Sequence, residues 1–331
     1  MAKYILKRIL ISILILFGVS LILYTLLRCM PTDFVESRII ALSQSAGGEA
    51  VSQELIETMY RAYGLDGNIF QGYFQWLGNA LRLDFGDSFI TKHPVVSDIF
   101  SADRIGTSFF VALIATIFEF LIAIPLGVTA ATHQYSIFDY VVTVFVLLGI
   151  SLPSFFFGQM LKDLFANKLQ WFPVSGMREP GITYGSAAEA MADYLRHMFL
   201  PILTVTILSI GSRMRMTRTN MLEVLSSDYI RTARAKGLSE GKVIYKHAFR
   251  NTMIPLVTSL AGLIPSLFSG AMITEQVFDL TGIGNYALNA MTQGDIPVIM
   301  TYNMFLAILS VIGVLLSDLM YAVVDPRVKL V

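Results

Sequence analysis

The run ILISILILFGVSLILYTLL, residues 9–27, decides the fold class of this chain. A helix needs about 20 apolar residues to cross the roughly 30 Å hydrocarbon core of a bilayer, and this run supplies 19. Lys3, Lys7 and Arg8 precede it, as in a signal peptide. A signal peptide, however, has an apolar core of about 7–15 residues followed by a cleavage site of small side chains. Because the longer run ends directly at Arg28, we expect it to be retained as the first membrane span.

The rest of the chain is similarly apolar. Of its 331 residues, 55% are hydrophobic and 15% charged, and the mean hydropathy is +0.64, whereas soluble domains carry about 25% charged residues. Backbone groups in lipid must form their hydrogen bonds within the protein, which favours helices. The sequence therefore predicts an all-α, polytopic membrane protein with six transmembrane helices. The expected spans cover residues 9–27, 107–130, 138–164, 198–217, 253–274 and 299–323.

Composition also argues against several classes of function. The formal net charge is zero, which gives no reason to expect nucleic acid as a partner. The single cysteine, Cys29, excludes an internal disulfide and a cysteine-based metal site. The four histidines form no i, i+4 pair. We therefore expect no metal ligand, no cofactor site and no catalytic residue in this chain.

Basic residues near the span ends predict the side on which each loop lies, because Lys and Arg favour the cytoplasmic side. With the N-terminus inside, the cytoplasmic parts contain three basic residues before the first span, nine from Arg213 to Arg250, and Arg327 and Lys329 after the last span. Both termini are therefore expected in the cytoplasm.

The loops divide the chain into three expected parts. Residues 1–30 hold the N-terminal segment and the first span, and residues 31–106 form a long external helical region. Residues 107–331 form a five-span core, which includes a cytoplasmic loop at 218–251. This loop is the only sizeable cytoplasmic structure that the pattern predicts.

The cytoplasmic loop has the pattern of two short helices joined by a glycine. Ser227 or Asp228 suits the N-cap of the first helix, and the acidic charge of Asp228 suits the positive end of the helix dipole. Gly237 can adopt the left-handed conformation that ends a helix, and Ser239 suits the N-cap of the second. Such an exposed basic helix pair fits a groove on a partner protein, or it is a solvated loop that only follows the positive-inside rule.

The same loop carries a family resemblance. The segment Tyr229–Ser239, YIRTARAKGLS, is similar to the pattern Y-x-R-T-A-R-A-K-G-L-S in the cytoplasmic EAA loop of binding-protein-dependent ABC importer permeases. It resembles especially the B-type subunit of the dipeptide, oligopeptide and nickel transporters. His247–Asn251 is similar to the H-A-L-R-N of that group. Other similar segments follow in the same order along the chain: Tyr63–Asp66, Trp171–Gly176, His197–Pro201, Gly282–Gly284, Asp295–Pro297 and Asp325–Arg327.

Three departures accompany this resemblance. The general EAA pattern has Glu-Ala-Ala six residues before the glycine, where this chain has Arg231-Thr232-Ala233. A final Leu-Pro pair is replaced by Phe249-Arg250, and both changes suit the peptide B-type group better than sugar importers. The P-G-D-P that follows the first span in that group is matched only loosely by Met30–Asp33.

The resemblance implies a permease subunit of the bacterial plasma (inner) membrane that forms half of a translocation pathway for dipeptides or oligopeptides. It implies a second homologous permease subunit as heterodimer partner, two cytoplasmic ATPases and an extracytoplasmic substrate-binding protein, with membrane lipid around the spans. ATP and Mg²⁺ would bind the ATPase subunits, since this chain has no G-x-x-x-x-G-K-[ST] motif. The residues expected to couple this chain to an ATPase are Tyr229, Arg231, Thr232, Ala233, Ala235, Lys236, Gly237 and Leu238.

Three polar residues within the expected spans are candidates for the pathway. Glu119 lies near the middle of a span, where a charge costs about 2.5–3.5 kcal/mol on insertion scales, so it should face protein or water. It either meets the charged amino end of a peptide or forms a contact with Ser or Thr on a neighbouring helix. Ser266 and Ser269 belong to a stripe of small residues that permits close helix approach. This stripe lines the pathway, joins a partner subunit or packs within the chain.

Other functions fit the sequence less well. An ion-coupled secondary transporter would show inverted repeats and buried coupling charges near the midplane, and only Glu119 has that character. An integral-membrane enzyme would need a clustered nucleophile, histidine pair or carboxylate pair on facing spans. Among importers, nickel chelates and oligosaccharides are the alternative substrates, and selectivity is expected to lie largely in the external binding protein.

Overall fold

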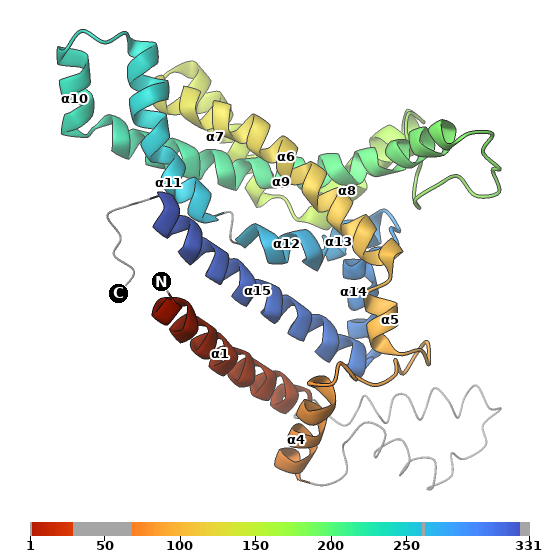
Figure 1. The fold of residues 1–331 in the computed structure, drawn as a ribbon. Helices are drawn as coiled ribbons and strands as arrows, with labels where there is room; N and C mark the ends of the chain where they lie inside the picture. Colours follow the sequence, from red (N-terminus) through yellow and green to blue (C-terminus); the bar gives the residue numbers. More distant parts are fainter. Residues whose placement is uncertain (1, 29–67, 260–261, 325–331) are drawn as a thin grey trace, which may run out of the picture. The chain divides into compact units, whose positions relative to one another are not determined.

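The structure is a computed structural model of the chain and describes residues 2–28, 68–259 and 262–324 (Figure 1). Every regular element in these ranges is a helix, and one isolated β-bridge joins Asp87 to Pro94. The all-α prediction is therefore confirmed for the described residues. About half of the expected external region, residues 31–67, lies outside them.

The helices differ widely in length, from 5 to 39 residues. In chain order they are α1 (Ala2–Arg28), α4 (Ile69–Ala80), α5 (Val95–Ile99), α6 (Ala102–Thr132), α7 (Ile137–Ser151), α8 (Ser154–Leu161), η1 (Lys162–Lys168), α9 (Ala187–Leu225), α10 (Asp228–Ala235), η2 (Lys242–Phe249), α11 (Arg250–Ser259), α12 (Leu263–Ser269), α13 (Met272–Val277), α14 (Ile283–Gln293) and α15 (Ile296–Val324).

Within the described ranges, four single helices are long and apolar enough to cross a membrane: Leu6–Leu26, Ala102–Thr132, Ala187–Leu225 and Ile296–Asp318. A fifth span results if the bent pair of α7 with α8 and η1 is counted as one. The remaining expected span, residues 253–274, falls on α11, α12 and the first residues of α13, and residues 260–261 lie outside the described ranges. The polytopic class is confirmed, while the number six remains a prediction.

A proline bends the third expected span sharply. Leu152 and Pro153 both have extended backbone, and the helices on either side meet at 104°. Proline lacks the amide hydrogen that a helix interior needs, and it disfavours helical geometry in the residue before it. The expected span 138–164 is therefore two helices with a break, whereas α6 continues through Pro125.

The chain divides into two compact units, and the first comprises residues 1–101 and 286–308. In this unit α4 packs on α1 through Tyr73, which is fully buried. The Tyr73 hydroxyl shares a hydrogen bond of 2.8 Å with the hydroxyl of Ser20, and its ring meets those of Phe17 and Tyr24 edge to face. These contacts fix α4 against the first span.

The second unit comprises residues 102–285 and 309–331, and its centre is the parallel contact of α6 with α9. The two helices lie side by side in Figure 1, with α7 also packed on α9. Glycine makes the close approach possible, because a Cβ on Gly127 would lie 2.7 Å from Cβ of Thr217. A Cβ on Gly211 would lie 2.9 Å from the Ile150 side chain. This unit carries every candidate site residue named from the sequence.

Candidate functional site

The expected cytoplasmic helix pair is present at the end of α9 (Figure 1), and residues 228–249 are called the coupling pair below. α10 begins at Asp228, after the extended residue Ser227. It is stopped by Gly237, whose φ of 75° is left-handed. The amide of Gly237 donates to the Arg234 carbonyl over 2.9 Å. The glycine stop predicted from sequence is therefore confirmed.

The inward face of the coupling pair is part of a buried apolar core. Ile230 is fully buried and Ala233 is 7% exposed. Burying one large aliphatic side chain stabilises a fold by about 1.5–3 kcal/mol. The position of α10 is thus set by the long helices beneath it. The cluster contains Ile230 and Ala233 of α10, Val243 and Ala248 of η2, Val128 and Ala131 of α6, and Met221 of α9.

The outward face of α10 and its turn carries most of the residues expected to meet an ATPase. Ala233 is the exception, because it points into the core and positions the helix from below. At one end of this face, Asn251 Nδ2 donates a hydrogen bond of 2.9 Å to the hydroxyl of Tyr229. This face therefore carries aromatic and basic side chains at its edges and small side chains at its centre. The exposed members are Tyr229, Arg231, Thr232, Ala235, Lys236, Gly237 and Leu238.

An exposed ion pair links the two helices of the coupling pair. Arg234 Nη2 lies 2.6 Å from Glu240 Oε1, and the guanidinium holds the pKa of that carboxyl below its usual value. Both side chains are largely in solvent. Exposed pairs add little to stability, so the apolar core is the main restraint on α10.

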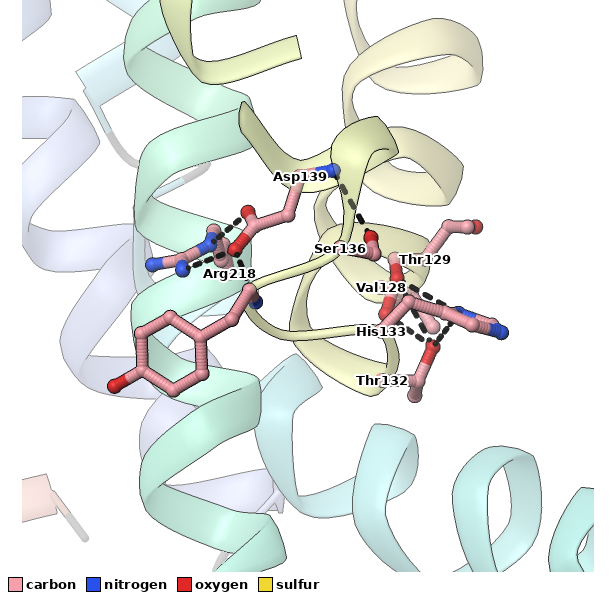
Figure 2. A network of polar contacts seen from close by, with 8 residues as sticks. Val128, Thr129, Thr132, His133, Ser136, Asp139 and Arg218 are labelled. Carbon is pink, nitrogen blue, oxygen red and sulfur yellow. Dashed lines mark hydrogen bonds and ion pairs between the residues drawn. The ribbon is translucent and has the colours of Figure 1, made fainter. Parts of the chain in front are cut away.

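A second ion pair attaches α7 to α9 near the coupling pair, and Figure 2 shows it from close by. Arg218 donates from Nε and Nη2 to the two carboxylate oxygens of Asp139, each over 2.8 Å. Ser136 caps α7 by accepting from the Asp139 amide, and the amide of Tyr135 donates to Asp139 Oδ2. The turn between α6 and α7 is thereby fixed to α9 by its backbone as well as by side chains.

A third polar cluster surrounds Glu119, which is almost buried in the middle of α6. Its partner is Arg213 of α9, whose Nε lies 2.9 Å from Glu119 Oε1. Arg213 Nη1 donates to Ser259 Oγ of α11 over 2.8 Å, and its Cζ lies 4.5 Å from the ring centroid of Phe120. The interhelix partner of Glu119 is therefore an arginine, whereas a Ser or Thr contact was one of the two alternatives expected from the sequence.

The two candidate serines lie apart from this ion pair in sequence, on α12. Ser266 is exposed, and its hydroxyl donates to the Leu263 carbonyl of the same helix over 2.8 Å. Ser269 is half-buried and contacts the Ser266 carbonyl over 3.3 Å. The Ser266 hydroxyl oxygen therefore still offers lone pairs to a solute.

One group of residues has the composition of a metal site. Ligand atoms of Glu179, Asp193 and His197 all lie within 4.8 Å of one another. Two of these side chains are already in contact with backbone or tyrosine groups, and His197 Nδ1 lies 2.9 Å from the backbone carbonyl oxygen of Asp193. Tyr184 and the Glu179 amide both donate to Asp193 Oδ2. These hydrogen bonds tie the loop before α9 to the start of that helix.

Sequence reasoning missed the Arg218 partner because it ended the fourth span at residue 217, and it placed Arg213 within that span without assigning it a partner. The helix in fact continues to Leu225. A usable signal was present, since Met214, Thr217 and Met221 recur at i, i+3 and i+7 and all three are buried. Such a stripe predicts a helix that continues past both arginines.

Long apolar helices with a polar pair inside them, and a short basic helix pair packed on their ends, define a membrane transport subunit. The chain belongs to the family of inner membrane components of binding-protein-dependent transport systems, whose model matches residues 123–330. A model for the N-terminal part of such membrane components matches residues 1–112.

Relatives align with the chain along nearly its whole length. It is 35% identical to the oligopeptide transport system permease protein AppB of Bacillus subtilis, over 99% of this chain and 100% of that protein. It is 32% identical to the dipeptide transport system permease protein DppB of Lactococcus lactis, over 100% of both. The chain is therefore a multi-pass inner-membrane permease subunit, and membership in this family implies work with an ATPase and a substrate-binding protein.

Proposed function

We propose that this permease forms half of a translocation pathway for dipeptides or oligopeptides and couples it to cytoplasmic ATPases through the coupling pair. The observation that carries the proposal is the two-sided packing of α10. Ile230 and Ala233 anchor it to the ends of α6 and α9, while Tyr229, Arg231 and Lys236 are exposed. A helix held this way transmits a push on its outer face to the spans beneath it.

The substrate class is supported by the relatives, one named for oligopeptides and one for dipeptides. Both align with the chain over 99% or more of its length. Glu119 and the serines Ser266 and Ser269 are the proposed pathway residues. Their polar groups would replace part of the water that a peptide loses as it crosses the membrane.

The proposed partner proteins supply the steps of transport that this subunit does not carry out. ATP and Mg²⁺ would bind two separate ATPase subunits, and a second homologous permease would supply the other half of the pathway in a heterodimer. An extracytoplasmic binding protein would deliver the substrate. With the coupling pair in the cytoplasm, both termini of this chain lie on that side as well.

Reconstitution of the whole complex tests the proposed substrate. The permease is co-purified with its partner subunits, placed in lipid vesicles, and assayed for ATP hydrolysis with a loaded binding protein. We expect stimulation by peptides and none by nickel chelates or oligosaccharides. Stimulation by either of the latter, with peptides inert, would replace the peptide assignment with that substrate.

Labelling of one introduced cysteine tests the orientation. Leu238 is exposed in the turn of the coupling pair, so Leu238→Cys is combined with Cys29→Ser to leave a single thiol. A membrane-impermeant maleimide should label this thiol in inside-out vesicles and leave it unlabelled in intact cells. Labelling in intact cells would place the coupling pair outside and overturn the proposed coupling role.

A further inference from the structure

The Glu119–Arg213 pair has polar capacity that the described part of the chain does not use. Arg213 uses Nε for Glu119 Oε1 and Nη1 for Ser259. Among the residues that the structure describes, Arg213 Nη2 and Glu119 Oε2 have no hydrogen-bond partner. The side chains of Arg213 and Glu119 are 13% and 8% exposed, so neither is completely enclosed by the protein. One free donor and one free acceptor therefore stand on adjacent, oppositely charged groups.

Stability alone does not explain why these charges lie within membrane helices. A buried ion pair is often no more stable than well-packed apolar side chains of the same size. Ionisable side chains inside a membrane usually face the bundle interior or a water-filled cavity and mark a solute pathway. The Arg213 guanidinium lies over the Phe120 ring and donates to the Ser259 hydroxyl, and these two contacts restrain its position. The cluster is thus built from α6, α9 and α11 with a fixed geometry.

The chemistry of the two free groups selects one class of ligand. A cation alone would compete with Arg213 for Glu119 and leave the guanidinium without its counter-charge. An anion alone would do the same to the carboxylate. A zwitterion supplies both counter-charges together, so neither side chain is left unpaired when the ion pair opens. A short peptide with free ends is such a zwitterion, with ammonium donors at one end and carboxylate acceptors at the other.

We propose that Glu119 and Arg213 form an exchangeable ion pair that selects peptides with both ends free, Glu119 taking the ammonium end and Arg213 the carboxylate end. This inference rests on the proposed peptide transport. It places a selectivity step in the permease itself, in addition to the step in the binding protein. Ser259 and Phe120 are positioning residues for Arg213 in this arrangement.

Three forms of one dipeptide test the proposal in the reconstituted complex: free Ala-Ala, N-acetyl-Ala-Ala and Ala-Ala-amide. Each is supplied at a concentration that saturates the binding protein, and uptake is compared between the wild type and three variants. Glu119→Gln removes the ammonium partner, and Arg213→Gln removes the carboxylate partner. The double variant Glu119→Gln/Arg213→Gln removes both charges together and so leaves no buried charge unpaired. Size-exclusion chromatography reports whether each variant still assembles with the ATPase subunits.

The wild type is expected to take up the free dipeptide faster than either blocked form. Glu119→Gln should lose the discrimination against the acetylated form, and Arg213→Gln the discrimination against the amide. In the double variant both preferences should fall by about tenfold, which corresponds to about 1.4 kcal/mol of transition-state discrimination.

A different outcome separates this proposal from the broader one. If the assembled double variant slows uptake of all three forms by the same factor, the pair is only structural and the selectivity proposal fails. Peptide transport itself would then still stand. If the wild-type complex transports none of the three forms while another solute class stimulates it, both proposals fail together.

Discussion

Arg218 of α9 donates two hydrogen bonds of 2.8 Å to the carboxylate of Asp139 of α7 (Figure 2). Arg218 lies ten residues before the start of α10. The carboxylate is 5% exposed and the guanidinium 25%. Arginine is suited to such two-point contacts because its planar fork matches a carboxylate. The pair therefore joins the turn between α6 and α7 to the segment of α9 that carries the coupling pair.

Asp139→Asn should destabilise the permease, because it leaves the Arg218 guanidinium without its counter-charge. Breaking a fully buried pair typically costs about 3–5 kcal/mol. Water reaches Arg218 in part, so we expect a loss of about 2 kcal/mol in the free energy of unfolding. Circular dichroism during denaturation in detergent micelles measures this change.

Glu240→Gln is the matched control, since it neutralises the carboxylate of an exposed arginine pair. Exposed pairs contribute little, so its unfolding midpoint should stay at the wild-type value. Equal losses in the two variants would show that burial does not distinguish the pairs and that Asp139 is not a structural link.

Gly237 tests whether the shape of the turn couples transport to ATP hydrolysis. Its φ is 75°, and a Cβ would meet no atom within 4 Å, so a substitution acts through backbone strain alone. A left-handed residue with a side chain costs about 1–2 kcal/mol, and asparagine tolerates this conformation. Gly237→Val should insert into the membrane normally yet lose most uptake per ATP hydrolysed, while Gly237→Asn keeps it. Normal uptake by Gly237→Val would contradict the coupling role of this turn.

Two alanines on α10 separate the anchoring face from the docking face. Ala233 is packed in the apolar core, whereas Ala235 is exposed two residues later. Ala233→Leu overpacks this core and should lower the free energy of unfolding by about 1–3 kcal/mol. Ala235→Leu should leave stability unchanged and weaken binding of the ATPase subunit in co-purification. If Ala235→Leu binds that subunit as well as the wild type, the docking surface lies elsewhere on the loop.

The sequence predicted the fold class because the hydrophobic signal is strong and local. The apolar runs 9–27 and 107–130 are long enough to cross a membrane, and the structure has long helices at both. The break at Pro153 was harder to predict, since a membrane helix can also continue through a proline. α6 passes through Pro125 as one helix. Whether a proline breaks a helix depends on packing around it, which one sequence does not reveal.

The coupling pair was largely predictable for the same reason. Asp228, Ile230 and Gly237 act through local helix rules, and their roles follow from spacing. The ion pairs were not predictable in that way. Glu119 and Arg213 are 94 residues apart, and their meeting depends on the crossing of α6 and α9. Spacing along the chain contains no information about such a crossing.

That crossing can be tested at a glycine. A Cβ on Gly127 of α6 would lie 2.7 Å from Cβ of Thr217 and 2.8 Å from the Met214 carbonyl oxygen, so α9 itself would have to move. Replacing a helical glycine by alanine otherwise stabilises a helix by about 0.5–1 kcal/mol. Gly149→Ala is the control, because its nearest contact is the Ile207 carbonyl at 3.8 Å.

We expect Gly149→Ala to be as stable as the wild type or more so, and Gly127→Ala to lose about 1–3 kcal/mol by overpacking. Gly127→Ala should also impair peptide transport, since α6 and α9 hold the Glu119–Arg213 pair and the core under α10. Denaturation in micelles and the three-dipeptide uptake assay measure the two effects on one preparation. If Gly127→Ala matched Gly149→Ala in both, α6 and α9 would not approach closely at Gly127, and the link from the ion pair to the coupling pair would have to run through another contact.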